Sequence, residues 1–199
     1  MKTVFMFSSQ GAQYAGMGKD LYKNYPVAKE IFDRADNVLG YSIKDICFED
    51  EQKLGETEFA QPAILTMSIA AMKVLEEEGV RADMTAGLSL GEYSAYVASE
   101  AMDFEEAVAL VQKRGKFMAE AVPSGEGAMY AIIGLDTALV EEACAEATAE
   151  GDGLAVPANY NAPGQIVIAG HAQAAKRAAA LAKEKGAKLT VPLKVSGPF

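Results

Sequence analysis

The sequence predicts an α/β protein built in two parts. Three observations support this prediction. Lys2–Phe7 is β-branched and aromatic, which is typical of a buried strand. A Gly-x-Ser-x-Gly pattern at 87–91 lies between a short apolar segment and a helix-forming one. From residue 128 onward the hydrophobic pattern alternates between strand and helix periods.

Composition limits the functional classes. The chain has 199 residues, 50% of them hydrophobic, which suffices for one large or two small domains. It shows no apolar run of the ~20 residues that a membrane span needs, and its apolar start is too short for a signal peptide. Cys47 and Cys144 stand apart without metal-ligand spacing, so we expect reduced thiols and a cytoplasmic protein. The net charge of −10 argues against nucleic acid and anionic membranes as partners.

The first 125 residues carry mostly helical patterns. Pro26 is suited to a helix start, Gly40 to a helix end, and Gln61-Pro62 to the opening of a strongly apolar, buried helix. An exposed acidic segment is expected over 49–58. The expected helical segments are Met17–Asn24, Val27–Leu39, Ile43–Phe48, Ala63–Glu78, Glu92–Met102 and Phe104–Ala121.

The part after the linker sequence 123–127 follows the order strand, helix, strand, strand, helix, strand. A turn sequence, Asn161-Ala162-Pro163-Gly164, separates the two central strands. That order makes a ferredoxin-like unit, so we expect a small domain at 126–195, and an α/β domain at 1–125 to which residues 196–199 return. The expected elements are Ala128–Gly134, Thr137–Glu150, Leu154–Tyr160, Gln165–Ala169, His171–Lys185 and Lys188–Leu193.

The Gly-x-Ser-x-Gly pattern is typical of a nucleophile elbow, a strand that turns sharply into a helix. Gly87 and Gly91 supply positions where a Cβ would clash, and Ser89 would project its hydroxyl from the bend. The N–H groups that open the following helix would face negative charge that develops nearby. The alternative is an ordinary tight turn.

Two further segments have both a functional and a plain interpretation. The small, polar loop 8–13, which contains Gln10, follows the first strand and could place backbone N–H groups over a site, or could be a surface loop. Arg114 lies in the later half of its predicted helix, where spacing alone favours a solvated side chain. Turned inward, its guanidinium would suit a carboxylate.

A serine nucleophile needs a general base, most often histidine. The only histidine, His171, falls at the start of a predicted small-domain helix, where an exposed or capping role is the better interpretation. We therefore expect either that the base lies beyond Phe199 or that the chain is not catalytic. The first part also has too few expected strands, about three, for a stable twisted sheet, which favours the first option.

Several short stretches, spread in order over the chain, resemble the malonyl-CoA:acyl carrier protein transacylases of the acyltransferase family of fatty-acid and polyketide synthesis. Together they make the resemblance specific. They are Gln10-Gly11-Ala12-Gln13, Gln61-Pro62-Ala63, Gly87–Ala95, Arg114–Met118, Asn159–Gly170 and Val195–Phe199. The resemblance implies an α/β-hydrolase-like large domain, here incomplete at its C-terminal end, with an inserted ferredoxin-like small domain.

The resemblance also implies roles for individual residues. Ser89 would carry the malonyl ester, the backbone N–H groups of Gln10 and Leu90 would form the oxyanion hole, Arg114 would bind the malonyl carboxylate, and Asn161 would lie near the thioester entrance. The family's catalytic histidine directly follows a VSGPF-like segment, and a glutamine that orients it lies further on. No metal and no cofactor is implied.

Two departures from the family pattern stand beside the proposed site. The family has histidine where Leu88 stands, and a Pro-Gly or Gly-Gly pair where Ser8-Ser9 stand. Leu88 removes a polar neighbour of the elbow, and Ser9 adds a side chain to the loop that would hold the oxyanion.

The resemblance implies ping-pong transfer of a malonyl group from malonyl-CoA to the thiol of acyl carrier protein. Because both partners are acidic, we expect a basic rim from Lys113, Lys116, Lys188 and Lys194. Two alternatives stay open: a serine hydrolase or thioesterase that uses the same elbow, and a non-catalytic module that binds carrier protein. We expect the 199-residue chain alone to be inactive or nearly so.

Overall fold

The computed structural model describes residues 2–121, 125–193 and 197–199. It has an α/β fold that divides into two compact units, Met1–Phe117 and Met118–Phe199. The division falls within α7 (Phe104–Ala121), somewhat before the expected boundary after residue 125. Residues 197–199 group with the second unit, and residues 194–196, which include Lys194 and part of the VSGPF segment, lie outside the described residues. The return of 196–199 to the large domain stays a prediction.

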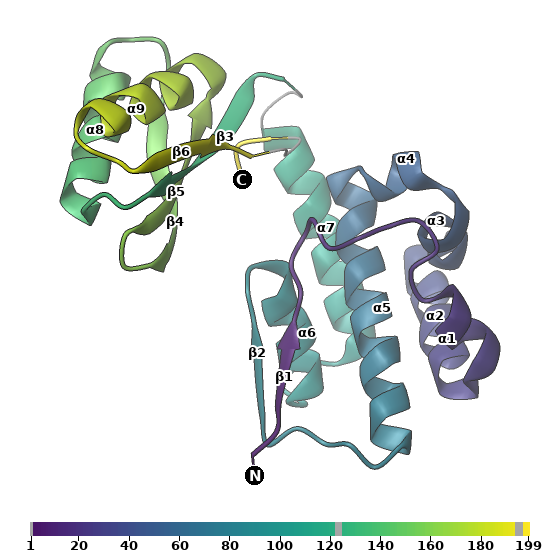
Figure 1. Ribbon diagram of the computed structural model, residues 1–199. Coiled ribbons are helices and arrows are strands. Elements are labelled where there is room, and N and C mark those ends of the chain that lie inside the picture. Colours follow the sequence, from purple (N-terminus) through teal and green to yellow (C-terminus); the bar gives the residue numbers. More distant parts are fainter. Residues whose placement is uncertain (1, 122–124, 194–196) are drawn as a thin grey trace. The chain divides into compact units, whose positions relative to one another are not determined.

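In the first unit a long helix, α5, runs between two groups of elements (Figure 1). On one side lie two parallel strands and α6, and on the other lie the helices that precede α5. The strands pair in parallel, with Phe7 opposite Gly87 at the end where both strands stop. The elements are β1 (Val4–Phe7), α1 (Lys19–Asn24), α2 (Pro26–Leu39), α3 (Ile43–Glu49), α4 (Glu51–Leu54), α5 (Thr57–Glu77), β2 (Met84–Gly87), α6 (Leu90–Ala98) and α7.

The core of this unit forms around α5. Leu65 and Ile69 of α5 are fully buried, as is Phe32 of α2. Tyr22, Phe32 and Phe48 pack their rings edge-on or tilted at centroid distances of 5.5–5.7 Å, which joins α1, α2 and α3. The buried helix that the apolar pattern predicted is therefore confirmed.

The start of α5 differs from the prediction. The helix begins at Thr57, so Pro62 lies inside it and not at its opening. Proline in a helix interior removes one backbone hydrogen bond, yet Ala60, Gln61 and Pro62 are all buried, and this tertiary packing outweighs the local cost. The segment 49–58 is largely exposed, as predicted, but it also contains α4, whose Leu54 is buried.

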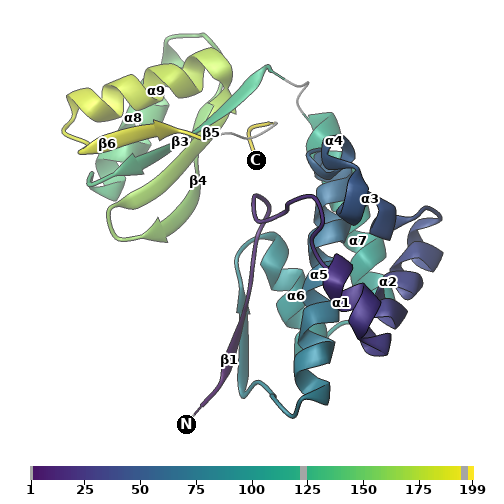
Figure 2. The same ribbon diagram turned by 45° about the vertical axis from the view of Figure 1, so that its right-hand side comes forward.

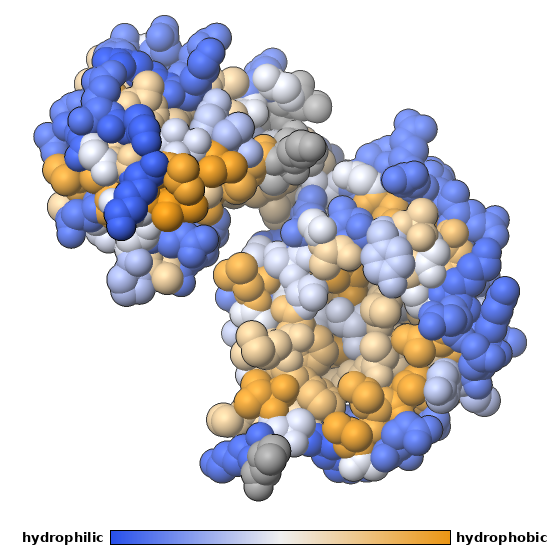
Figure 3. Space-filling view, viewed as in Figure 1, coloured by the Kyte–Doolittle hydropathy of each residue, from blue (hydrophilic) through white to orange (hydrophobic). Residues whose placement is uncertain are grey.

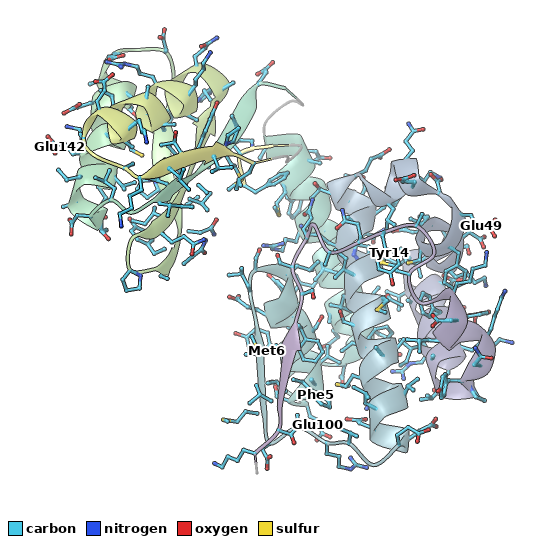
Figure 4. All side chains as sticks on the ribbon, in the orientation of Figure 1. Phe5, Met6, Tyr14, Glu49, Glu100 and Glu142 are labelled. Carbon is cyan, nitrogen blue, oxygen red and sulfur yellow. The ribbon has the colours of Figure 1, made fainter. Side chains whose placement is uncertain are left out.

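The first strand was predicted to be buried, and that prediction is wrong for this chain. Met6 is 82% exposed and Val4 45% exposed, while Phe5 points the other way and packs on the core (Figure 4). Among the described residues β1 pairs only with β2, so no strand lies along its second edge. A shallow groove runs between that edge and α5, and Figure 3 shows apolar residues gathered on this face.

The elbow helix also differs in its ends. α6 begins at Leu90, directly after Ser89, and ends at Ala98, whereas the expected segment ran from Glu92 to Met102. Glu100 adopts a φ of 60°, a left-handed conformation that stops the helix early.

The second unit is a four-stranded antiparallel sheet with two helices on one face (Figure 2). The order of elements is strand, helix, strand, strand, helix, strand, as predicted, and the strand order across the sheet is β4-β5-β3-β6. The elements are β3 (Gly127–Ile133), α8 (Thr137–Ala149), β4 (Ala155–Ala162), β5 (Gln165–His171), α9 (Ala172–Glu184) and β6 (Leu189–Pro192).

The edge strand β4 corrects one detail of the sequence analysis. Asn161 and Ala162 belong to the strand, and only Pro163-Gly164 form the turn. The pairing with β5 shifts register between Pro157 and Asn159 and again between Tyr160 and Ala162. Such irregularities suit an edge strand, which can hold a proline and can re-aim a side chain.

The described residues bear on two other functional classes, membrane-spanning proteins and metal-binding proteins. Within the ranges 2–121, 125–193 and 197–199, no helix is long and apolar enough to cross a membrane. In the same residues no group of three or more His, Cys, Asp or Glu side chains is arranged to hold a metal ion.

The two cysteines are buried free thiols, and burial raises the pKa of Cys47 to about 12 and that of Cys144 to about 11. We expect both to react with Ellman's reagent at pH 8 roughly 100-fold slower, or more, in the native chain than in guanidinium chloride. Unfolded thiols ionise near their ordinary pKa of 9.0, so the free energy of unfolding should fall as pH rises from about 9 toward 12. Immediate reaction of both thiols in the native chain would contradict the buried placement.

Candidate active site

The elbow is built by a close crossing of three backbone segments. A Cβ on Gly87 would lie 2.1 Å from the carbonyl carbon and oxygen of Gly91, and a Cβ on Gly91 would lie 2.2 Å from the carbonyl oxygen of Phe7. Side chains cannot be accommodated at these distances, so both glycines are required by space. This confirms the steric reason that the sequence suggested for them.

Ser89 occupies the bend itself. Its φ of 53° and ψ of −107° lie outside the conformations that residues other than glycine ordinarily adopt. Strand β2 ends two residues before Ser89 and helix α6 begins one residue after it, so the tertiary structure holds this conformation from both sides. The strand–turn–helix context that a nucleophile elbow requires is therefore present.

The hydroxyl of Ser89 meets the guanidinium of Arg114. Nη2 of Arg114 donates to Ser89 Oγ at 2.9 Å, and Nη1 donates to Gln61 Oε1 at 2.8 Å. The guanidinium carbon also lies 5.6 Å from the centre of the Tyr93 ring, which suits a cation–π contact. Spacing alone favoured a solvated Arg114, but the structure turns it inward onto the serine.

The charge of Arg114 is not neutralised by these contacts. In the part of the chain that the structure describes, both hydrogen-bond acceptors of its guanidinium are neutral, one an amide oxygen and the other a hydroxyl. A half-buried guanidinium beside a serine hydroxyl is suited to bind an anionic group on a molecule that the serine attacks.

The loop with Gln10 begins beside the elbow. Gly91 approaches the carbonyl oxygens of both Phe7 and Ser8, so the chain leaves β1 next to the first turn of α6. The Gln10 side chain is anchored, because its Nε2 donates to Thr57 Oγ1 at 3.1 Å. Leu90, the other residue expected to supply an oxyanion N–H, is fully buried at the first position of α6.

The remaining candidates lie in the second unit. Asn161 is exposed on β4, within the irregular stretch that pairs with β5. His171 is exposed, and its Nδ1 accepts a hydrogen bond from the Leu154 backbone N–H at 3.0 Å. It stands at the N-cap of α9 without a side-chain cap bond there, so the exposed interpretation holds and the capping one does not.

Sequence reasoning missed two residues that contact this site, Thr57 and Gln61. Gln61 belonged to a stretch that carried the resemblance, but no role followed from it. The signal available in the sequence was a pair of polar residues four positions apart at the start of an apolar segment.

The chain's similarity to known proteins is consistent with this geometry. Residues 4–195 match the family of acyl transferase domains. The chain belongs to this family. Among curated relatives, "Malonyl CoA-acyl carrier protein transacylase" of Bacillus subtilis is 51% identical over 199 residues, which are 100% of this chain and 62% of the relative.

Solved structures of acyl transferases have the same fold as this chain. The crystal structure of MCAT from Streptococcus pneumoniae superposes with a TM-score of 0.92 at 54% identity. The match covers 100% of this chain and 64% of the MCAT chain. A malonyl-transacylase solved in complex with a type II PKS acyl-carrier protein superposes at 0.89 with 43% identity, again covering 100% of this chain and 64% of its own. This acyl transferase chain thus spans less than two thirds of the length of these relatives.

The elbow geometry makes a direct prediction. Gly91→Ala should destabilise the chain by more than ~2 kcal/mol, because the added methyl meets the Phe7 carbonyl oxygen and the backbone must shift. Gly55→Ala is the matched control. Gly55 has ordinary helical dihedrals and a nearest contact of 3.2 Å, so its cost should stay below about 1 kcal/mol. Urea unfolding of both variants measures the difference, and equal costs would contradict the close crossing at Gly91.

Proposed function

We propose that the protein containing this chain transfers a malonyl group from malonyl-CoA to the phosphopantetheine thiol of acyl carrier protein, by way of an ester on Ser89. The single observation that supports this most directly is the 2.9 Å hydrogen bond between Arg114 Nη2 and Ser89 Oγ. It joins a group able to bind a free carboxylate to a nucleophile able to attack the thioester at the other end of the same small molecule.

In the first half-reaction Ser89 Oγ attacks the thioester carbonyl carbon. A new C–O bond forms and the hydroxyl proton passes to a base. Collapse of the tetrahedral intermediate then breaks the C–S bond, and the leaving sulfur takes that proton from the base and departs as coenzyme A. In the second half the carrier-protein thiol gives its proton to the base and attacks the ester carbonyl carbon. A C–S bond forms, the C–O bond to Ser89 breaks, and the base passes that proton to Ser89 Oγ. The N–H groups of Gln10 and Leu90 are the proposed donors to the carbonyl oxygen as its negative charge develops.

The general base is proposed to come from residues outside this chain. The one histidine of the chain is exposed on the second unit and uses Nδ1 to accept from Leu154. The relatives are longer by more than a third of their own length, which leaves room for a further catalytic residue. The chemistry as proposed uses no metal ion and no cofactor.

The finer description of the fold also remains a proposal. We propose that the first unit belongs to an α/β-hydrolase-like domain and that the second is a ferredoxin-like domain inserted in it. The strand order β4-β5-β3-β6 supports the second assignment. Within the described residues no strand pairs with the second edge of β1, and Met6 is exposed; both observations support a larger sheet in the protein that contains this chain.

Acyl carrier protein and coenzyme A are the proposed partners, in the cytoplasm. Lys113 and Lys116 are exposed on the same helix as Arg114, and Lys188 belongs to the second unit. We propose that these lysines attract the acidic partners locally against the overall charge of −10. Asn161 is the proposed contact near the thioester entrance.

A serine hydrolase or thioesterase is the second candidate function, since the elbow alone would serve it. The placement of Arg114 argues for the transferase, because a hydrolase of neutral esters has no need of a cation hydrogen-bonded to its nucleophile. The third candidate function is a non-catalytic module that binds carrier protein. It would apply if no general base were supplied to Ser89.

The proposal is tested by labelling Ser89 in the full-length protein with radioactive malonyl-CoA. We expect one malonyl ester per chain, its loss in Ser89→Ala, and transfer to acyl carrier protein on addition of the carrier. Arg114→Ala should lower malonyl labelling at least ~100-fold, because a charged hydrogen-bonding partner of the carboxylate is lost. Arg81→Ala, which removes an exposed arginine of the same unit, should label normally.

Release of free malonate at the rate of transfer, with or without carrier protein, would favour the hydrolase. Binding of carrier protein without any ester would favour the non-catalytic module. A labelled residue other than Ser89 would overturn the proposed mechanism.

A further inference from the structure

Two polar side chains are buried at the beginning of α5, a helix whose other buried residues are apolar except for Thr66. Thr57 is 3% exposed and Gln61 is not exposed at all. They are four positions apart in the sequence and therefore lie on the same side of the helix, one turn apart. Buried polar groups are costly unless their hydrogen bonds are made, so the contacts of this pair indicate why they are present.

Each member of the pair contacts one residue of the proposed site. Thr57 Oγ1 accepts from Gln10 Nε2 at 3.1 Å, and Gln61 Oε1 accepts from Arg114 Nη1 at 2.8 Å. Gln10 is the proposed source of an oxyanion N–H, and Arg114 is the proposed carboxylate ligand. One turn of one helix therefore anchors the residues proposed for the two ends of the substrate.

The position of this turn is set by a close helix contact. Gly115 follows Arg114 in α7, and a Cβ there would lie 2.7 Å from the Thr57 carbonyl oxygen and 3.0 Å from Glu58 Cα. The backbones of α5 and α7 thus touch at the residue beside Arg114. This contact fixes the register between the two helices and brings Gln61 within reach of the Arg114 fork.

We infer that Thr57 and Gln61 are positioning residues of the transferase, with Thr57 aligning the Gln10 loop for the developing oxyanion and Gln61 holding the Arg114 fork for the substrate carboxylate. The inference rests on the proposed function and extends it. Neither residue touches the substrate. Thr57 acts through Gln10 and affects kcat. Gln61 acts through Arg114 and affects KM for malonyl-CoA.

The two roles make separate kinetic predictions. The oxyanion exists only in the transition state, so loss of the Thr57 hydroxyl should lower kcat and leave KM for malonyl-CoA unchanged. The malonyl carboxylate is present throughout, so loss of the Gln61 acceptor should raise KM for malonyl-CoA. The transfer of an acyl group without a carboxylate, such as acetyl, should not depend on Gln61.

Thr57→Val in the full-length protein tests the first role. We expect kcat for malonyl transfer to fall roughly tenfold with KM unchanged, and Thr57→Ser, which keeps the hydroxyl, to restore most of it. Thr66→Val is the matched control. Thr66 is a buried threonine of the same helix, and its Oγ1 makes no hydrogen bond within the residues that the structure describes, so its removal should leave kcat and KM unchanged.

Gln61→Met tests the second role, since methionine has a similar volume but offers no amide oxygen. We expect KM for malonyl-CoA to rise roughly tenfold and the kcat/KM for acetyl-CoA, measured in parallel, to stay unchanged, so that the preference for malonyl falls by the same factor. A structural role alone would reduce both reactions together.

The outcomes separate the two hypotheses. If the unmodified protein forms no malonyl ester on Ser89, the proposed function is wrong, and the positioning inference that rests on it is wrong as well. If the unmodified protein transfers malonyl normally and Thr57→Val behaves like Thr66→Val, or Gln61→Met changes malonyl and acetyl transfer equally, the positioning inference is overturned. Circular dichroism and thermal unfolding confirm that each variant is folded before its kinetics are compared.

Discussion

The site depends on a steric constraint at the elbow. The end of β1, the end of β2 and the first turn of α6 come so close that Gly87 and Gly91 have no space for a side chain. This crossing holds Ser89 in a conformation that a serine would otherwise leave, since its φ of 53° is unfavourable away from such a context. The packing of the surrounding elements offsets the free-energy cost of this conformation. In this conformation the Ser89 hydroxyl projects at the end of the two strands. Everything else in the site is arranged around that hydroxyl.

Arg114 contributes the second half of the site, and its position is a property of helix packing. A guanidinium held between an amide oxygen and a hydroxyl keeps its full charge, whereas a carboxylate neighbour would neutralise it and compete with an acidic ligand. The Tyr93 ring beneath it adds attraction without charge. The same helix that supplies the amide also anchors the Gln10 side chain through Thr57, so α5 holds both Arg114 and Gln10.

The surface of the first unit is consistent with a chain that spans less than two thirds of its relatives' length. The two parallel strands pack Phe5 on the core from one side, whereas Met6 and Val4 on the other side are exposed beside a groove on α5. Parallel strands are ordinarily covered on both faces. The second unit does not share this feature, because its four strands and two helices enclose a core of their own, built from residues such as Ile132, Ile166 and Ile168.

The sequence by itself determined the elements whose cause is local. The Gly-x-Ser-x-Gly turn, the apolar helix over most of 57–77, and the strand and helix order after residue 126 all follow from periodicity and from glycine placement. Only the tertiary structure decided which way Arg114 faces, that Pro62 lies within a helix, and that β1 is exposed. These depend on contacts between residues far apart in the chain. Gly115 lies against Thr57, Gln61 accepts from Arg114, and among the described residues β1 pairs with β2 alone. A local pattern specifies what a segment can form, but the side it buries is set by the partners that fold against it.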